Sequence, residues 1–279
     1  DLLKSVALET AYLRARLRTV IKSLDFVGIV HGVPKGRNLS GRYLVDSRTA
    51  LLAGEYPKKA YDQWEEETDT SAAVAVVVDE SISMKDLLQS TTQMVMTLTE
   101  PFVSLHCPTL VVGFRDGPKG VRPSDAQDTG DSRSYHRYHG VHYDIFKMWH
   151  ERFNTIQWRF ANTRAVGGTP MSDGIQYGLK AIGTRTETHR FLFVITDGEP
   201  NPGHPLVIRR QIRLARETGI HLIGVGVGES ARYVQTLFDD HVWSETVAEM
   251  PKLLISKLNE QVDQHVGKQR CGAESTKGA

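Results

Sequence analysis

From residue 71 onward, the chain alternates between continuous apolar runs and segments with helical periodicity. The apolar runs are Ala72–Val78, Thr109–Phe114, Phe191–Thr196 and Ile220–Val225. Such runs are typical of strands that are buried on both faces of a parallel sheet. The helical segments are Lys85–Thr99, Pro170–Ile182, Pro205–Thr218, Ser230–Phe238 and Thr246–Val262. This alternation predicts an α/β domain with a doubly wound, mostly parallel open sheet across residues 71–263. Two further stretches, Thr155–Arg159 and His241–Trp243, favour short additional strands.

The residues before this domain have a different pattern. Apolar residues recur at three- and four-residue steps over Asp1–Leu24 and predict an amphipathic helix. The rest of this region is expected to be a loop, a short helix and an acidic linker, at Gly28–Gly41, Leu44–Gly54 and Tyr56–Thr70. We therefore expect an N-terminal helical extension and linker over 1–70, the α/β domain over 71–263 and a disordered tail over 264–279.

Composition narrows the class of protein. The 279 residues are 40% hydrophobic and 24% charged, which excludes a wholly disordered chain. The formal net charge of +1 gives no reason to expect nucleic acid or an acidic membrane as partner. No apolar run reaches the ~18 residues of a membrane helix. With two cysteines and spaced rather than continuous apolar residues at the start, the sequence favours a cytoplasmic protein.

Oxygen-bearing side chains follow three of the predicted elements. Asp79, Ser81 and Ser83 come directly after the first buried strand, and Asp197 follows another. Thr169 opens a predicted helix, with Pro170 at its first turn. Ligands bind beyond the carboxyl ends of parallel strands, so these five side chains are expected at one edge of the sheet. Carboxylate and hydroxyl oxygens suit Mg²⁺ or Mn²⁺, and octahedral geometry leaves about one position for water or a partner carboxylate. Helix capping is the simpler alternative for each segment taken alone.

The pattern Asp-x-Ser-x-Ser, then Thr, then Asp-Gly after a strand resembles the metal-ion-dependent adhesion site of von Willebrand factor A (VWA) domains. The resemblance covers 71–262. It implies that Ser81, Ser83 and Thr169 contact the metal directly, and that Asp79 and Asp197 act directly or through water. Glu199, beside Asp197, is a secondary candidate that would tune the charge at the metal.

A narrower resemblance links the flanking segments to the C-terminal part of the CobT subunit of aerobic cobaltochelatase. The segments concerned are Gly41–Arg48, His142–Lys147 and Gly224–Gly228, the last followed by Arg232 and Tyr233. This likeness implies an AAA+ ATPase of the CobS or MoxR type as partner, together with a large cobalt- and tetrapyrrole-binding subunit. The complex would insert cobalt into a corrin ring, and a ring-shaped partner would favour a homo-oligomer of this chain.

Other functions stay open. The chain has no G-x-x-x-x-G-K-[ST] phosphate loop, so ATP hydrolysis would belong to the partner and no turnover is expected from this chain alone. One alternative is a general VWA adhesion or scaffold module. Another is a virus- or plasmid-borne CobT-like adaptor with a different substrate. An aspartyl-phosphate enzyme would use Asp79 as nucleophile, but Ser81 stands where such enzymes carry a second Asp.

Two further clusters invite a functional interpretation. His136, His139 and His142 are spaced at three residues in the long polar segment Gly117–His142, and on one helix they would gather a transition metal. Ordinary histidines in a solvated loop are the alternative. Four basic residues would dock an acidic partner or nucleic acid, or would form a solvated face: Lys35, Arg37, Arg42 and Arg48.

Overall fold

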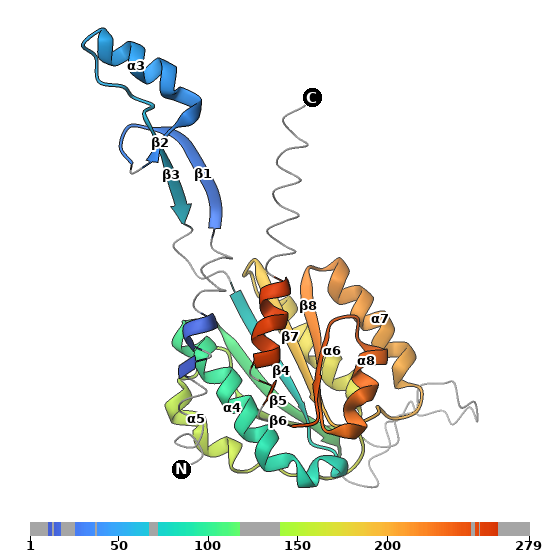
Figure 1. Ribbon diagram of the computed structural model, residues 1–279. Helices are drawn as coiled ribbons and strands as arrows, with labels where there is room; N and C mark the ends of the chain where they lie inside the picture. The colour runs from blue at the N-terminus through green and yellow to red at the C-terminus, as the bar shows by residue number, and fades with distance from the viewer. Residues whose placement is uncertain are drawn as a thin grey trace. The chain divides into compact units, whose positions relative to one another are not determined.

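Six strands form a mixed sheet in the order β6-β5-β4-β7-β8-β9 in the computed structural model (Figure 1). Their bounds are β4 Ala72–Asp79, β5 Thr109–Asp116, β6 Val141–Lys147, β7 His189–Thr196, β8 Ile220–Val227 and β9 His241–Ser244. All neighbours pair in parallel except β5 and β6, which are antiparallel. The doubly wound, mostly parallel α/β fold expected from the sequence is therefore confirmed.

The structure describes residues 11–12, 14–17, 26–36, 38–66, 72–117, 140–246, 249–250 and 252–261. The chain divides into two compact units. One comprises Asp1–Val20 with Ser71–Ala279, and the other comprises Ile21–Thr70. No helix among the described residues is long and apolar enough to cross a membrane.

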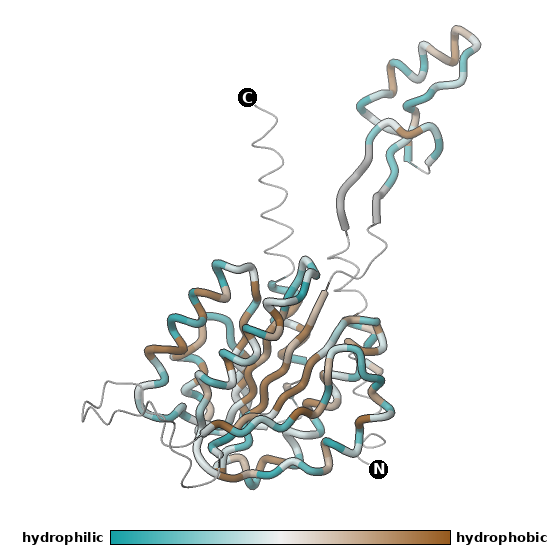
Figure 2. The backbone as a smooth tube through the Cα atoms, turned by 180° about the vertical axis from the view of Figure 1, so that it is seen from behind, coloured by the Kyte–Doolittle hydropathy of each residue, from teal (hydrophilic) through white to brown (hydrophobic). Residues whose placement is uncertain are grey.

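Helices cover both faces of the large sheet. They are η2 Ile82–Asp86, α4 Leu88–Ser104, α5 Phe153–Phe160, α6 Met171–Gly183, α7 His204–Glu217, η3 Glu229–Tyr233 and α8 Val234–Leu237. Ala75 and Val77 of β4 share a core cluster with α6 and α7. Because side chains of a strand alternate between faces, Val74 and Val76, which are equally buried, are covered on the opposite face. Figure 2 shows the strands as the most hydrophobic part of this unit.

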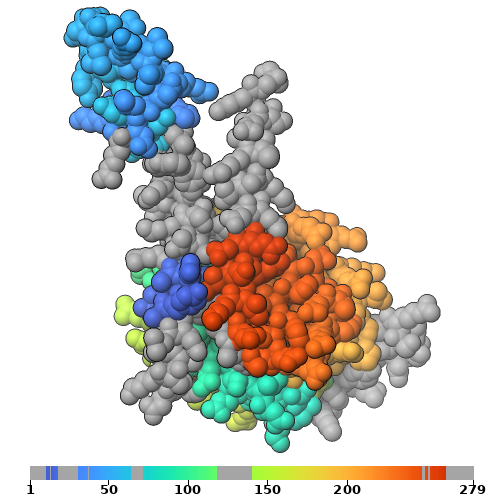
Figure 3. Space-filling view, in the orientation of Figure 1, coloured from blue at the N-terminus to red at the C-terminus, as the bar shows by residue number. Residues whose placement is uncertain are grey.

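The two ends of the chain add helices to the same unit. Residues 252–261 are helical, and Figure 3 shows them in red on the surface of this unit. At the other end, residues 14–17 are helical, which agrees with the helix expected there. Leu17 is 1% exposed, and Arg14 forms an ion pair with Glu100 of α4. The described part of the N-terminal helix therefore packs on its own domain.

Several elements differ from the sequence-based expectation. The segment Thr155–Arg159, expected as a strand, lies in helix α5, because Phe153, Ile156 and Phe160 are buried at helical spacing. Strand β6 begins at Val141, at the end of the polar segment, and pairs as an antiparallel edge strand. The helix expected at Ser230–Phe238 is a 3₁₀ turn followed by one short helical turn.

The smaller unit contains strands where a loop and a linker were expected. Its antiparallel sheet has the order β1-β3-β2, with β1 Phe26–Val33, β2 Asn38–Leu39 and β3 Tyr61–Glu66. A 3₁₀ turn, η1 Gly41–Tyr43, leads into helix α3 Leu44–Leu52, which was expected. Strand β3 was missed because its sequence, YDQWEE, is mostly polar. Strand β1 is apolar, but Gly28 and Gly32 within it favoured the interpretation of a loop.

Candidate functional site

The site is built where β4 and β7 end side by side. These strands are parallel neighbours, with Val78 opposite Ile195. Their final residues, Asp79 and Thr196, therefore meet at the carboxyl edge of the sheet, and the Thr196 hydroxyl donates a hydrogen bond of 2.8 Å to Asp79 Oδ2. The open edge of a parallel sheet is where such folds place ligands.

A chain of hydrogen bonds connects four of the five predicted metal ligands. The backbone N–H of Ser81 donates to Asp79 Oδ1 at 2.8 Å. The hydroxyls of Ser81 and Ser83 lie 2.9 Å apart, and the Ser83 hydroxyl donates to Asp197 Oδ1 at 2.9 Å. Residues separated by more than a hundred positions thus converge on one point, which helix capping alone does not require.

The loop of Thr169 is attached to both neighbouring loops through its backbone. The N–H of Ile82 donates to the carbonyl of Gly167 at 3.0 Å. Thr169 donates its N–H to Asn201 Oδ1 at 3.1 Å, and its carbonyl accepts from the Asn201 N–H at 3.1 Å. Thr169 is itself buried. Its loop therefore lies against the Asp79 loop and is fixed by the segment that follows Asp197, while direct ligation by its hydroxyl remains a prediction.

Three supporting residues were not identified from the sequence. They are Thr196 and Asn201, described above, and Asp116, whose Oδ2 accepts the Gly168 N–H at 3.0 Å. Asp116 and Thr196 are the last residues of β5 and β7. Their position at strand ends was the available signal, but only the tertiary structure shows which loop each one holds.

The two carboxylates of the site are buried without a basic partner. Asp79 is 0% exposed and Asp197 is 5% exposed. Burial raises the pKa of Asp79 to about 7, and the charge of Asp197 adds to this effect. Burial also raises the pKa of Asp197, although the hydrogen bond from Ser83 opposes the shift. Within the described ranges neither carboxylate forms an ion pair with Lys or Arg, and a bound cation would offset this unfavourable charge.

Other predicted ligands lie apart from this constellation. Glu199 is exposed, and His142 pairs with Asp144 at 3.2 Å on β6. His136 and His139 lie outside the described residues. In the part of the chain that the structure describes, no group of three or more His, Cys, Asp or Glu residues is arranged to hold a metal. The cluster of Asp79, Ser81, Ser83 and Asp197 is not such a group, because it has only two carboxylates and its other oxygen donors are hydroxyls.

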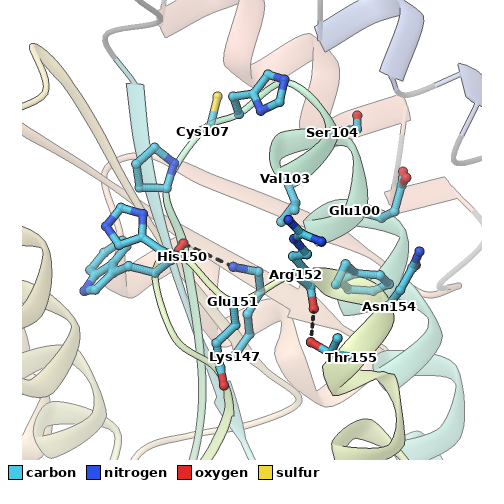
Figure 4. Close-up of a pocket in the computed structure, with 14 residues that line it drawn as sticks. Glu100, Val103, Ser104, Cys107, Lys147, His150, Glu151, Arg152, Asn154 and Thr155 are labelled. Atoms are coloured by element: carbon cyan, nitrogen blue, oxygen red, sulfur yellow. Dashed lines mark hydrogen bonds between the residues drawn. The ribbon is translucent and has the colours of Figure 1, made fainter.

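A separate pocket of about 700 Å³ opens at the other end of the strands, where the parallel strands begin (Figure 4). It is lined by Cys107, which precedes β5, and by Lys147, which ends β6. The ammonium of Lys147 is buried and donates to the carbonyls of Thr109, Met148 and Trp149 at 2.8, 2.9 and 3.2 Å. This pocket lies at the amino ends of the parallel strands and does not overlap the candidate metal site.

Comparison with known proteins establishes the fold. No protein-family model matches the sequence, and no curated protein matches it. Proximal thread matrix protein 1 from the mussel byssus, in a structure with a zinc-occupied MIDAS motif, has a TM-score of 0.50 at 16% identity. A mutant of the PilB minor pilin from Streptococcus sanguinis has a TM-score of 0.50 at 14% identity. A von Willebrand factor type A structure from Catenulispora acidiphila has a TM-score of 0.43 at 16% identity.

These matches span only part of this chain and part of each neighbour. The match covers 68% of this chain and 46% of the mussel chain, and it covers 75% of this chain and 66% of the pilin chain. At such identities the likeness concerns architecture alone. The chain has a VWA-like α/β fold, with a mostly parallel sheet between flanking helices.

Proposed function

We propose that this chain is a metal-dependent protein-binding module. Asp79, Ser81, Ser83, Thr169 and Asp197 would hold one divalent cation, with the two aspartates acting directly or through water. The observation that carries the proposal is the hydrogen-bonded chain from Asp79 through both serines to Asp197. These donors are carboxylate and hydroxyl oxygens that hydrogen bonds hold in place at the carboxyl ends of the strands, so they fit Mg²⁺ or Mn²⁺.

The cation would recognise a partner through its remaining coordination position. A carboxylate from another protein fits this position because the charge-assisted contact is strong and depends on the metal. Neighbours that share the fold support a binding role: one is a matrix protein whose MIDAS motif holds zinc, and another is a minor pilin. A general adhesion or scaffold module is therefore the broader form of the proposal. Zn²⁺ is a third candidate cation beside Mg²⁺ and Mn²⁺, because the MIDAS motif of the mussel protein holds zinc.

Metal binding is tested by calorimetry with Mg²⁺, Mn²⁺ and Zn²⁺. We expect one cation per chain for the unmodified protein, and no uptake when Asp79→Ala is combined with Ser81→Ala. Glu199→Ala is the matched control, because this carboxylate is exposed and lies two residues from Asp197. Loss of binding in the control, or binding that survives in the double variant, would contradict the assignment.

A narrower form of the proposal names the partner as a cytoplasmic AAA+ ATPase of the MoxR or CobS type. It rests on the sequence resemblance of the flanking segments, among them Gly41–Arg48 and His142–Lys147, to a cobaltochelatase subunit. In that complex this chain would carry no ATPase activity and would transmit the movement of the ATPase to a tetrapyrrole-binding subunit. Cobalt would then be the substrate of the complex and distinct from the resident cation.

The partner is tested by co-precipitation with a purified AAA+ ATPase of the MoxR or CobS type. We expect capture in Mg²⁺ and loss of capture in EDTA or in the Asp79→Ala, Ser81→Ala variant. If the ATPase is captured equally well in EDTA and by the double variant, the contact is not bridged by a metal. Absence of capture from a preparation that still binds Mg²⁺ would reject the ATPase while retaining the metal site.

A further inference from the structure

Helix α3 of the smaller unit exposes its largest apolar side chains. Leu44, Val45, Leu51 and Leu52 are 52%, 76%, 62% and 81% exposed. The buried residue of this helix is Ser47, a small polar residue. An amphipathic helix normally buries its apolar side chains and exposes its polar ones, so the arrangement here is inverted.

The exposed side chains form one continuous face. At 3.6 residues per turn, Leu44, Val45, Leu51 and Leu52 fall within about a third of the helix circumference. Arg48 projects from the middle of this face and is also exposed. Asp46 lies on the opposite side of the helix. The face therefore combines four aliphatic side chains with one central cation. Figure 2 shows the same helix with brown, hydrophobic positions along its coil.

The described side chains of the smaller unit leave this face exposed. Among the side chains described within 21–70, the buried ones belong to Ser40, Ser47, Pro57 and Ala60. Leu39 and Tyr56 add exposed apolar area, at 63% and 68%. Exposed apolar side chains that gather on one element typically mark an interaction surface.

Charge indicates the kind of partner. Arg48 is the charged residue on this face, and Asp46, the other charged residue of the helix, lies on the opposite side. Arg48 is the middle residue of the nine-residue helix. If two copies of this chain paired through α3 about a two-fold axis at the helix centre, Arg48 of one copy would lie against Arg48 of the other. This repulsion disfavours self-association and favours an acidic surface.

We infer that the face formed by Leu44, Val45, Arg48, Leu51 and Leu52 docks an acidic amphipathic helix of a partner protein. The aliphatic side chains of the partner would cover the leucines, and a partner carboxylate would pair with Arg48. This contact uses residues remote in sequence from the metal ligands. It is a second interaction surface that does not depend on the proposed cation.

The test uses the full chain and two labelled synthetic peptides in fluorescence anisotropy. One peptide is a Leu/Glu amphipathic helix, and the other has Lys in place of every Glu. We expect the Leu/Glu peptide to bind, in EDTA as well as in Mg²⁺. Leu51→Ser with Leu52→Ser should weaken its affinity about tenfold or more, because two buried leucines are lost. Arg48→Glu should reverse the preference toward the Leu/Lys peptide.

A matched control and two alternative occupants complete the design. Leu206→Ser with Leu214→Ser removes two leucines of α7 that are 58% and 52% exposed, and it should leave binding unchanged. Thermal unfolding verifies that all variants are folded. The inference is overturned if the unmodified chain fails to bind the Leu/Glu peptide, or if the α3 and α7 variants behave alike. It is also overturned if Leu51→Ser with Leu52→Ser dissociates a dimer that the unmodified chain forms in sedimentation. The same holds if this variant abolishes binding of the chain to phosphatidylserine vesicles.

Discussion

At the scale of single residues, the metal-site loops depend on groups packed behind them. Glu80 follows Asp79 and is fully buried, and its backbone N–H donates to the Phe114 carbonyl at 2.9 Å. Its carbonyl accepts the Val166 N–H at 2.9 Å, which joins the Asp79 loop to the segment that leads to Thr169. Burial, with a smaller effect from Asp144, raises the pKa of Glu80 to about 8. The Glu80 carboxyl lies over Gly113, where there is no side chain to obstruct it.

Replacing Gly113 by alanine should destabilise the fold. The added Cβ would lie 2.3 Å from Glu80 Oε2 and 2.9 Å from a ring carbon of Phe146, so buried groups would have to move. We expect a loss of about 1–3 kcal/mol in the free energy of unfolding, measured in urea. Gly183→Ala is the control, because its Cβ would meet no atom within 4 Å. Equal stability of the two variants would show that the Glu80 carboxyl is free to move.

Lys147 should give the stability a distinct pH dependence. Burial lowers the pKa of its ammonium to about 8, below the ordinary value of 10.5. Between these values the unfolded chain binds more protons than the folded chain, so the contribution of Lys147 to stability rises with pH. Urea unfolding at pH 8 and pH 10 should show a smaller rise for Lys147→Met than for the unmodified protein. Identical rises would mean that Lys147 keeps its ordinary pKa in the fold.

At the scale of elements, the N-terminal helix belongs to the α/β domain. Leu17 is buried, and Arg14 pairs with Glu100 on α4, which packs beside β5. The ion pair is partly exposed and contributes little, since surface pairs are typically worth less than ~1 kcal/mol. Of these two contacts, burial of Leu17 is therefore the stronger.

Truncating Leu17 should lower the stability of the domain measurably. Leu17→Ala removes a buried side chain and leaves a cavity, at a cost of about 2–5 kcal/mol in the free energy of unfolding. Tyr12→Ala removes a ring that is 46% exposed and contacts the Arg16 guanidinium, so it should change the free energy by less than about 1 kcal/mol. Denaturant unfolding followed by circular dichroism measures both. An equal effect of the two substitutions would mean that the helix does not depend on this contact.

At the scale of the whole molecule, two compact units carry separate interaction chemistry. The α/β unit presents the candidate metal site at its carboxyl edge, and the smaller unit presents the apolar face of α3. A cation that binds the folded α/β unit should stabilise that unit, because binding to the native state alone shifts the unfolding equilibrium.

Magnesium should therefore raise the melting temperature of the α/β unit. At a concentration about 100 times its Kd, one bound cation adds ~2.7 kcal/mol. For a domain of this size, each kcal/mol corresponds to about 2–4 °C. Calorimetric scans with and without Mg²⁺ measure the shift, which should vanish in the Asp79→Ala, Ser81→Ala variant. A shift that persists in this variant would place the stabilising cation elsewhere.

The sequence by itself determined the four central strands, the helices α4, α6 and α7, and the convergence of Asp79, Ser83 and Asp197. Strands buried on both faces require continuous apolar runs, and parallel strands end at the same edge, so both properties follow from local pattern. The tertiary structure decided the antiparallel pairing of β6, the small sheet within 21–70 and the roles of Asp116, Thr196 and Asn201. It also decided that the apolar face of α3 is exposed. These features depend on contacts between distant residues, whose partners no local pattern specifies.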